Sequence, residues 1–428
     1  MSPAAASSRP GEAAGVSVAR RAAYQVVLRV FEQDSYADRA FTTAASRLRE
    51  RDRSLARRIA YGTIQRVRTL DHGIATLGRR PVARLDAPVR TALRIGAYQL
   101  AFLDGVPARA AVHESVELVR AAGLERAVPF TNAVLRRLAA GLRDLVAALP
   151  DDTPAEAALR YSYPDWVAEI WCRDLGAAEA RALMLAQNEP AGTVVRMNRL
   201  KRGDVEGRPD ADLTDALHVD RVDERDVARG LVFPQSVGSQ LAGLAVGAGE
   251  GERVLDLCAA PGAKTTQLAE RAAEVVAVEV HPGRARELAE NCRRLGALNV
   301  RIVTADALEL PAGVGGRFDR VLVDAPCSGL GVLASRPDLR WRARPLPELQ
   351  TALLRVAAQR VRPGGAILYS VCTINADESE AVVDASGLHP DDLGAEWTRF
   401  RHPRRPEFLL TLPHRHRTSG FFVARLRA

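Results

Sequence analysis

Apolar residues recur at helical spacing through the first third of the chain. From Val18 to Leu149 they return every three or four residues, with almost none of the alternation that is typical of strands. In "ARRAAYQVVLRVFEQ" they form one stripe, and "RSLARRIAYGTIQRVRTL" repeats the pattern. Further helices are predicted in "PVRTALRIGAYQLAFL", "AAVHESVELVRAAG" and "TNAVLRRLAAGLRDLVAAL". We therefore predict a compact all-α domain over residues 18–148.

In the last part of the chain, short apolar runs alternate with helical stretches. "RVLDL" precedes "KTTQLAERA", "VVAVEV" precedes "RARELAENCRRLG", "FDRVLVDA" precedes "LPELQTALLRVAAQRV", and "GAILYSV" precedes "ADESEAVVDAS". Continuous apolar strands that alternate with helices indicate a parallel sheet covered on both faces. We predict a doubly wound α/β domain over residues 241–428, with its ligands at the carboxyl ends of the strands.

Between and before these two domains the periodicity of apolar residues is weaker. The run "LPDDTPAEAA" holds two prolines and small residues, which predicts a linker at 149–160. Residues 161–240 contain the helical "YPDWVAEIWCRDLG" and the strand-like "GTVVRMNRLK", which predicts a small α+β subdomain. Residues 1–17 lack the basic and apolar regions of a secretory signal, and their Ala, Ser, Pro and Gly content predicts a disordered tail.

Composition adds a preference for the kind of partner. Apolar residues make up 47% and charged residues 26% of the chain, as in ordinary soluble proteins, and no apolar run approaches the ~18 residues of a membrane span. The net charge of +8, carried mostly by arginine, favours a polyanion such as a nucleic acid. Helical arginines such as Arg51, Arg53, Arg57 and Arg58 suit either a solvated face or contacts with phosphates.

The cysteines do not form a metal-binding or disulfide pattern. They are Cys172, Cys258, Cys292, Cys327 and Cys372. Without a CxxC pair or a Cys-His cluster, we expect neither zinc nor another metal, no disulfide framework, and a reduced cytoplasmic protein. Cys172 and Cys292 fall in helical patterns, where a cysteine is usually a small buried apolar side chain.

The first predicted strand of the α/β domain runs into a loop of small residues, "DLCAAPGAKTTQ", that leads into a helix. Such a loop lets backbone approach a ligand closely, and a helix start offers free N–H groups. It matches neither GxGxxG nor GxxxxGK[ST], so a dinucleotide or a nucleoside triphosphate is poorly supported.

Four acids, Asp256, Glu279, Asp306 and Asp324, come at the ends of successive predicted strands. An acid at the second strand end is where a ribose diol is held, and Asp306 could accept from an adenine amino group. The structural alternative is that these acids cap the following helices. With no phosphate loop, fold analogy favours S-adenosylmethionine (AdoMet) as the cofactor. The expected cofactor-binding residues are Asp256, Cys258, Ala259, Ala260, Pro261, Gly262, Ala263, Lys264, Glu279, Asp306 and Asp324.

Two strand ends deliver a thiol, Cys327 in "FDRVLVDAPCSGLGVL" and Cys372 in "GGAILYSVCT". A cysteine nucleophile needs a lowered thiol pKa, for which nearby cations and helix starts are the usual means, and Lys264 is a candidate cation. The residues alone leave open which thiol attacks.

Three motifs carry a family resemblance. "VLDLCAAPGAKTTQLAE", "DAPCSGLGVLASRPDLRWR" and "YSVCTINADESEAVV", in this order, resemble the Nop/Sun family of RNA cytosine-5 methyltransferases. "AVHESVELVR" and "FTNAVLRRL" resemble the helical RNA-binding domain of NusB. The resemblance implies a NusB-like bundle, a small α+β RNA-binding insertion and a Rossmann-like AdoMet-dependent domain. It also implies methyl transfer to carbon 5 of a cytosine in small-subunit (16S) ribosomal RNA, by a protein that we expect to be a monomer.

The resemblance implies roles for single residues. Cys372 is the nucleophile that attacks carbon 6, Cys327 helps to release the product, and Asp324 contacts the base. DNA cytosine-5 methyltransferases use a Pro-Cys thiol instead, which would point to Cys327, but the chain lacks their Glu-Asn-Val motif. Arg196 and Asn198 in "VVRMNRLK" are candidates for RNA contacts, with a plain surface strand as the alternative.

The chain departs from the family pattern in four places. The family's "PGGK" is "PGAK" here, so Ala263 would be strained if that position needed a positive φ. Glu279 replaces the usual Asp, "VCT" replaces "TCS", and Gln235-Ser236 replaces "QD". Two other functions stay open: a non-catalytic NusB-like RNA-binding or antitermination factor, and a DNA cytosine-5 methyltransferase.

Overall fold

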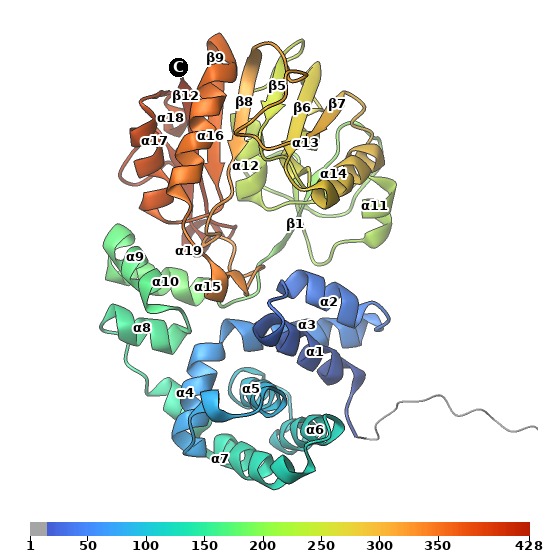
Figure 1. The fold of residues 1–428 in the computed structure, drawn as a ribbon, viewed down its shortest axis with the longest axis vertical. Helices are drawn as coiled ribbons and strands as arrows, with labels where there is room; N and C mark the ends of the chain where they lie inside the picture. The colour runs from blue at the N-terminus through green and yellow to red at the C-terminus, as the bar shows by residue number, and fades with distance from the viewer. Residues whose placement is uncertain (1–14) are drawn as a thin grey trace, which may run out of the picture. The chain divides into compact units, whose positions relative to one another are not determined.

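The computed structural model describes residues 15–428 (Figure 1). Of the expected disordered tail, residues 1–14 lie outside the described residues. The chain forms two compact units. The first consists of the chain up to Glu169 together with Arg336–Trp341, and the second consists of Ile170–Ser335 and Arg342–Ala428. None of the helices within residues 15–428 has the length and apolar character needed to cross a membrane.

The first unit is helical, as the periodicity predicts. Its helices are α1 (Val18–Glu32), α2 (Ala37–Ala45), α3 (Glu50–Gln65), α4 (Val67–Gly78), α5 (Ala87–Phe102), α6 (Ala108–Ala121), α7 (Val128–Ala147) and α8 (Pro154–Tyr161). The predicted stripes meet in one core, where Val26, Ile59 and Leu93 are fully buried. Helix α8 begins inside the segment expected as a linker, 149–160, because Thr153 and Glu156 form a capping box that starts a helix there.

A segment from far along the chain completes this helical unit. Arg340 is fully buried and donates to the carbonyl oxygens of Gln65 at 2.9 Å and Ser162 at 3.0 Å, with its guanidinium 3.8 Å from the Tyr163 ring centroid. Burial lowers the pKa of Arg340 to about 10. The adjacent Trp341 packs against the helical core and donates its indole N–H to a backbone carbonyl in α3 at 2.7 Å. The segment Arg336–Trp341 is therefore structural in the helical unit.

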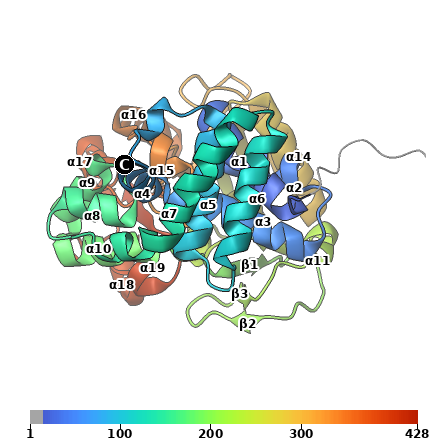
Figure 2. The same ribbon diagram turned by 90° about the horizontal axis from the view of Figure 1, so that it is seen from below.

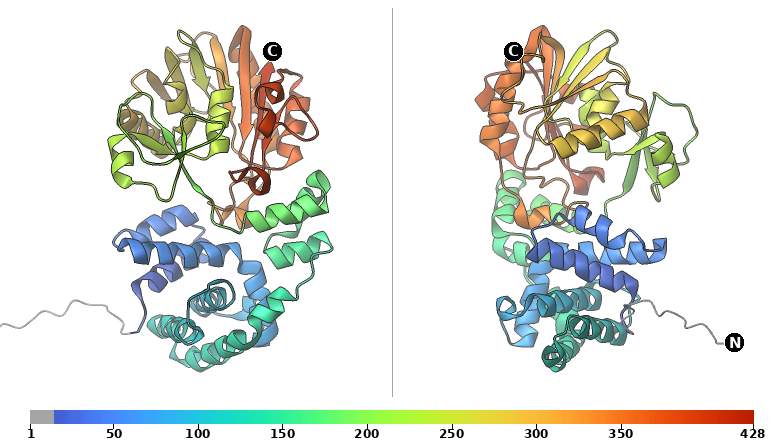
Figure 3. Two further views of the ribbon diagram at one scale, coloured as in Figure 1. Left: turned by 180° about the vertical axis from the view of Figure 1, so that it is seen from behind. Right: turned by 45° about the vertical axis from the view of Figure 1, so that its right-hand side comes forward.

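The second unit contains an eight-stranded sheet whose strands are visible in both views of Figure 3. Its strands are β5 (Arg253–Asp256), β6 (Glu274–Glu279), β7 (Val300–Thr304), β8 (Phe318–Asp324), β9 (Val361–Val371), β10 (His389–Pro390), β11 (Leu409–Thr411) and β12 (Phe421–Arg427). The strand order is β10-β12-β9-β8-β5-β6-β7, and β11 pairs with β12. Strands β7, β6, β5, β8 and β9 are parallel, which confirms the predicted doubly wound core, while β12 adds an antiparallel edge.

The strand order places a ligand site. From β5 the chain proceeds outward through β6 and β7 and then returns to the other side of β5 as β8. In sheets of this kind ligands bind outside the carboxyl ends of the strands where the order reverses. That position lies between Asp256 at the end of β5 and Asp324 at the end of β8.

The helices of this unit are α9 (Asp165–Leu175, which begins in the helical unit), α10 (Ala177–Ala186), α11 (Glu224–Arg229), α12 (Val237–Ala245), α13 (Ala263–Leu268), α14 (Pro282–Leu295), α16 (Pro347–Arg360), α17 (Glu380–Ser386), α18 (Leu393–Glu396) and α19 (Pro413–His416), with α15 (Leu339–Arg342) at the boundary.

A second, four-stranded sheet lies in the region expected to be a small α+β subdomain. Its antiparallel strands are β1 (Thr193–Met197), β2 (Arg208–Pro209), β3 (Ala216–Val219) and β4 (Val232–Pro234), in the order β2-β3-β1-β4.

Both expectations for Arg196 and Asn198 were wrong, because neither side chain is at the surface. Arg196 is 1% exposed, forms an ion pair with Glu270 and donates to the side chain of Gln235 at 2.9 Å. Asn198 is 3% exposed and donates to the carbonyl oxygens of two residues, Gly230 and Leu295, at 2.8 Å each. These side chains hold the small sheet to its neighbours and do not reach RNA.

Candidate active site

The loop after β5 is organised by the buried carboxylate of Asp256. One oxygen accepts from the Thr265 hydroxyl at 2.8 Å, and the other from the backbone N–H of Cys258 at 3.4 Å. Burial raises the pKa of Asp256 to about 7. Burial also raises the pKa of the Cys258 thiol, so this cysteine is not prepared to act as a thiolate. The loop is thus built on a buried carboxyl group that holds its backbone in place.

The glycine requirement in this loop falls on Gly262 and not on position 263. Gly262 has a φ of +104°, and a Cβ there would lie 2.6 Å from a side-chain carbon of Leu288. Ala263 is the first residue of α13 and has ordinary helical backbone, so its methyl group is not strained. The replacement of the family glycine therefore leaves the loop conformation intact.

The acids after β5, β6 and β7 share one local geometry. Each accepts from the backbone N–H two residues further on: Asp256 from Cys258, Glu279 from His281 at 2.9 Å, and Asp306 from Leu308 at 2.8 Å. Asp256 and Glu279 do not cap α13 and α14, whose cap residues are others, Gly262 and His281. The capping alternative is therefore wrong for these two. Glu279 is buried and Asp306 is exposed.

Asp324 at the end of β8 is held by two partners from distant parts of the chain. Its Oδ2 lies 2.8 Å from the Lys264 ammonium, and its Oδ1 accepts from the Ser370 hydroxyl at 2.7 Å. Lys264 is itself buried, donates to Ser239 at 3.1 Å and lies 4.9 Å from the Phe421 ring centroid. The ion pair connects the loop after β5 to the end of β8, which leads into the loop that carries the Pro-Cys thiol.

The two candidate thiols, Cys327 and Cys372, lie in contact with each other. The Sγ atoms of Cys327 and Cys372 are 3.4 Å apart. The hydrogen bond with Cys327 lowers the pKa of Cys372, and the positive charge of Lys264 acts in the same direction. The same hydrogen bond, burial and the negative charge of Glu378 raise the pKa of Cys327 well above its usual value. The arrangement favours a thiolate at Cys372 beside a neutral thiol at Cys327.

Glu378 is a residue that the motif analysis did not single out. Its carboxylate is fully buried and accepts from the backbone N–H and hydroxyl of Ser328, and from the backbone N–H of Leu346 at 3.0 Å. It also accepts from the side-chain amides of Gln350 at 3.0 Å and Asn375 at 3.4 Å. Ser328 follows one thiol and Asn375 lies three residues after the other, so this carboxylate connects both thiol-bearing loops. The only hint in the sequence was an acid close behind "SVCT".

Side chains from α9 and the residue after α10 also hold these loops. The indole N–H of Trp171 donates to the carbonyl of Ile374 at 2.9 Å. The side chain of Gln187 donates to the carbonyl of Leu330 at 2.9 Å and accepts from the N–H of Leu333 at 3.0 Å. The loops after both thiols are therefore fixed by buried hydrogen bonds.

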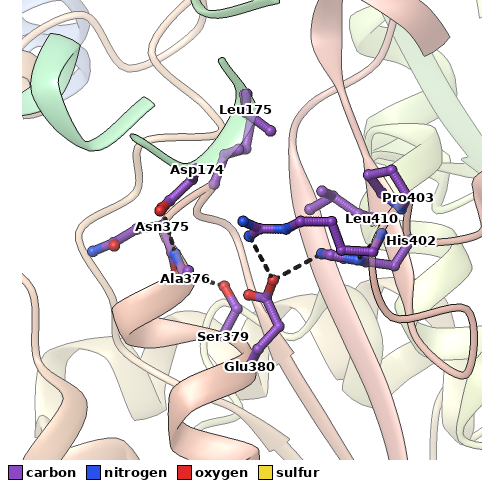
Figure 4. Close-up of a pocket in the computed structure, with 11 residues that line it drawn as sticks. Asp174, Leu175, Asn375, Ala376, Ser379, Glu380, His402, Pro403 and Leu410 are labelled. Carbon is purple, nitrogen blue, oxygen red and sulfur yellow. Dashed lines mark hydrogen bonds and ion pairs between the residues drawn. The ribbon is translucent and has the colours of Figure 1, made fainter. Parts of the chain in front are cut away.

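A small cleft lies behind the Cys372 loop (Figure 4). Asp174 accepts from the backbone N–H of Ala376 at 3.0 Å, and Glu380 pairs with His402 at 3.0 Å and Arg404 at 3.2 Å. Its volume of about 20 Å³ suffices for one water molecule. The cleft is too small for a nucleobase, and its charged groups pair with one another.

The remaining cysteines lie elsewhere. Cys292 is buried in α14, as expected, and Cys172 is half-buried in α9. Within residues 15–428 no three His, Cys, Asp or Glu side chains are grouped so as to hold a metal ion.

Comparisons with known proteins agree with this fold. A family model described as 16S rRNA methyltransferase RsmB/F matches residues 244–427, and the NusB family model matches residues 17–140. The chain is 37% identical to the ribosomal RNA small subunit methyltransferase B of Thermus thermophilus, over 88% of this chain and 89% of the relative. It is 33% identical to a probable ribosomal RNA small subunit methyltransferase B of Synechocystis, over 96% of this chain and 99% of the relative.

Solved structures share the fold. The crystal structure of PH0851 superposes with a TM-score of 0.77 at 24% identity, over 96% of this chain and 98% of that one. NSun6 from Pyrococcus horikoshii with SFG superposes with a TM-score of 0.56 at 22% identity, over 62% of this chain and 98% of that one.

The helical unit, the doubly wound sheet and these relatives define an AdoMet-dependent RNA methyltransferase. The chain belongs to the 16S rRNA methyltransferase RsmB/F family.

Proposed function

We propose that this RNA methyltransferase transfers a methyl group from AdoMet to carbon 5 of a cytosine in small-subunit ribosomal RNA, through a covalent cysteine adduct at carbon 6. The observation that carries the proposal is the meeting of two strand-end thiols, 3.4 Å apart, beside the Lys264–Asp324 ion pair. The names of the relatives from Thermus thermophilus and Synechocystis support the substrate.

The residues after β5, β6 and β7 fit AdoMet. Its adenosine part offers ribose hydroxyls and an amino group, which are donors that suit the carboxylates of Asp256, Glu279 and Asp306. The loop from Cys258 to Lys264 supplies the small side chains that let backbone approach such a ligand. When bound, AdoMet supplies an electrophilic methyl group to the reaction.

The chain's own residues activate the base. Carbon 5 of cytosine is too weak a nucleophile to take the methyl group unaided. The Cys372 thiolate adds to carbon 6, and the electron pair of the 5,6 double bond becomes available at carbon 5. Asp324, which Lys264 and Ser370 hold in position, shares a proton with ring nitrogen 3 of the base and so stabilises the adduct.

Release needs a proton acceptor. After methylation, carbon 5 carries both the methyl group and a hydrogen, and the adduct ends when that proton leaves and the Cys372–carbon 6 bond breaks. We assign assistance in this step to Cys327, the other thiol of the pair. Once the Cys372 sulfur is bonded to carbon 6 it no longer carries the negative charge that raises the pKa of Cys327. Cys327 then gives its proton to water, its thiolate takes the proton from carbon 5, and Cys372 leaves carbon 6 as a thiolate.

RNA is bound by other parts of the chain. Carbon 6 is reachable only when the cytosine is unstacked or lies in a single strand. We propose that the helical unit, with its many exposed arginines, and the region of residues 161–240 supply this grip.

One experiment tests the reaction and its alternatives. The purified full-length protein is incubated with AdoMet and either unmodified small-subunit ribosomal RNA transcript or duplex DNA, and 5-methylcytosine is mapped. We expect 5-methylcytosine in the RNA alone. A methyl group on another atom contradicts the proposal, transfer to DNA alone favours a DNA methyltransferase, and transfer to neither favours a non-catalytic RNA-binding factor.

A further inference from the structure

A cleft of about 390 Å³ runs between α6 and α7 of the helical unit. The two helices lie side by side (Figure 2) and pack against each other. Ligand pockets for small molecules and single nucleotide units begin at about 300 Å³, so this cleft is large enough for one. It is formed by the two segments that carry the NusB-like motifs, "AVHESVELVR" and "FTNAVLRRL", together with residues just before the first of them.

Four hydrogen-bonding side chains line the cleft. Arg109 and His113 lie one turn apart on α6, and Asn132 and Arg136 lie one turn apart on α7. Asn132 is half-buried and the other three are exposed. Within residues 15–428 none of the four side chains has a hydrogen-bond or ion-pair partner. They are available to a ligand.

The acids nearest in sequence do not neutralise the two arginines. Glu114 accepts from the Ser17 hydroxyl and forms an ion pair with Arg20 at 3.0 Å. Glu117 forms an ion pair with Arg120. The cleft therefore presents two uncompensated guanidinium groups, which attract an anionic ligand.

The floor of the cleft is apolar. It is formed by Val112, which is half-buried, and Val116, which is buried. A floor of this kind accommodates the flat face of an unpaired base. This combination matches a single-stranded nucleotide. The basic groups at the rim suit its phosphates, the imidazole suits the π-face of its base, the amide suits the edge of the base, and the apolar floor suits its body.

We infer that the α6–α7 cleft binds a single-stranded segment of the RNA substrate. Arg109 and Arg136 hold the phosphates, an unstacked base covers Val112, and His113 and Asn132 contact its face and its edge. A duplex keeps its bases stacked and presents only its backbone, so the cleft discriminates in favour of single strands. This inference rests on the proposed RNA substrate and assigns it a second contact, away from the thiol pair.

The test measures RNA binding without AdoMet, so it does not depend on methyl transfer. Binding of a labelled single-stranded fragment of small-subunit ribosomal RNA to the full-length protein is followed by fluorescence anisotropy at several salt concentrations. The variant is Arg109→Ala/Arg136→Ala. The matched control is Arg293→Ala/Arg355→Ala, which removes the same charge from two exposed arginines outside the helical unit and outside residues 161–240. Circular dichroism checks that each variant is folded.

We expect the cleft pair to lower affinity about tenfold or more at moderate salt, and to reduce the steepness of the salt dependence by roughly 1 to 2 in the log–log slope. The control pair changes affinity by less than about threefold. His113→Ala and Asn132→Ala each weaken single-strand binding by about fivefold without changing the slope, because they contact the base and not a phosphate.

Three results would overturn the inference. The first is unchanged affinity in the cleft pair, and the second is an equal loss in both arginine pairs, which would mean diffuse attraction. The third is a loss in the arginine pair with no effect of His113→Ala or Asn132→Ala, which would mean an anion site suited to an acidic peptide. Methylation that persists in any of these cases leaves the proposed reaction standing, so the two failures can be told apart.

Discussion

The Sγ atoms of Cys327 and Cys372 lie 3.4 Å apart, although 45 residues separate them in sequence. They occupy the carboxyl ends of adjacent parallel strands, β8 and β9, where the sheet itself brings them together. A hydrogen bond between two thiols makes them unequal, because one sulfur must donate and the other accept. The proposed mechanism uses this inequality by giving each cysteine a different role.

The cysteine roles predict opposite results for two single substitutions. Cys372→Ala should abolish methyl transfer and form no covalent RNA complex, because the attacking sulfur is gone. Cys327→Ala should accumulate a covalent complex, because the adduct forms but is not resolved. Denaturing gels of labelled RNA with AdoMet measure this, with Cys172→Ala as a control that keeps both thiols. The reverse pattern would show that Cys327 attacks.

Removal of the buried ammonium should slow the reaction in a pH-dependent way. Lys264→Met eliminates the positive charge that lowers the pKa of Cys372 and leaves Asp324 without its partner. We expect the single-turnover rate near pH 7 to fall roughly tenfold or more, and to recover partly at higher pH as the thiol ionises. Lys201→Met is the matched control, since Lys201 is the only other lysine in the sequence. A loss that is equal at every pH would contradict the electrostatic part of this prediction.

Glu378 should affect the release step. Glu378→Gln keeps most of the hydrogen-bonding geometry but removes a negative charge that raises the pKa of Cys327, so the pH profile of product release should shift to lower pH. Glu378→Ala leaves the Ser328, Leu346 and Gln350 donors without an acceptor and should slow turnover more severely. Chase of a preformed covalent complex across pH measures the profile. If the Gln variant is slow but its profile is unshifted, Glu378 acts through loop structure alone.

Asp256 should make the protein less stable as pH rises. Burial raises its pKa to about 7, against roughly 3.9 in an unfolded chain. Between about pH 4 and 7 the folded state holds a proton that the unfolded state has released, so the free energy of unfolding falls by up to about 1.4 kcal/mol per pH unit in this window. Urea unfolding of the wild type and Asp256→Asn at pH 5 and 8 measures this effect. We expect the wild type to lose stability relative to the variant at pH 8; a constant difference would refute the shift.

The buried Arg196–Glu270 pair should matter for stability and not for RNA affinity. Arg196→Met leaves Glu270 buried without its counter-charge, which costs about 3–5 kcal/mol. Arg196→Met/Glu270→Leu should recover most of that loss because no isolated charge remains. Urea unfolding gives the stability, and RNA binding by the folded variants should match the wild type. A stable Arg196→Met variant with weakened RNA binding would restore Arg196 as an RNA contact.

Sequence patterns predicted the strand ends and the residues on them. Asp256, Glu279, Asp324 and Cys372 were placed at one edge of the sheet because the carboxyl ends of parallel strands meet there. The pKa order of the two thiols was not predictable, since it depends on Lys264 and Glu378, which approach only in three dimensions.

Other errors have the same physical origin. Arg196 follows the alternation of a surface strand, but its partner Glu270 lies 74 residues further on and local periodicity does not reveal it. In the sequence, Glu378 resembles an ordinary acid at a helix start, because the groups that donate hydrogen bonds to its carboxylate lie in other parts of the chain. The segment Arg336–Trp341 shows no helical periodicity that would assign it to the helical unit. In each case a buried polar partner far along the chain determines where the side chain or segment lies, and local sequence patterns do not reveal that partner.

The place of Arg340 in the helical unit sets an order of events during protein synthesis. Gln65 leaves the ribosome 275 residues before the arginine that donates to its carbonyl, and Trp341 arrives later still. The nascent helical unit must therefore wait, with this docking site open, until strands β5 to β8 have been translated. Only then can Arg340 and Trp341 dock, so the amino-terminal unit is the first to be made but cannot be the first to be completed.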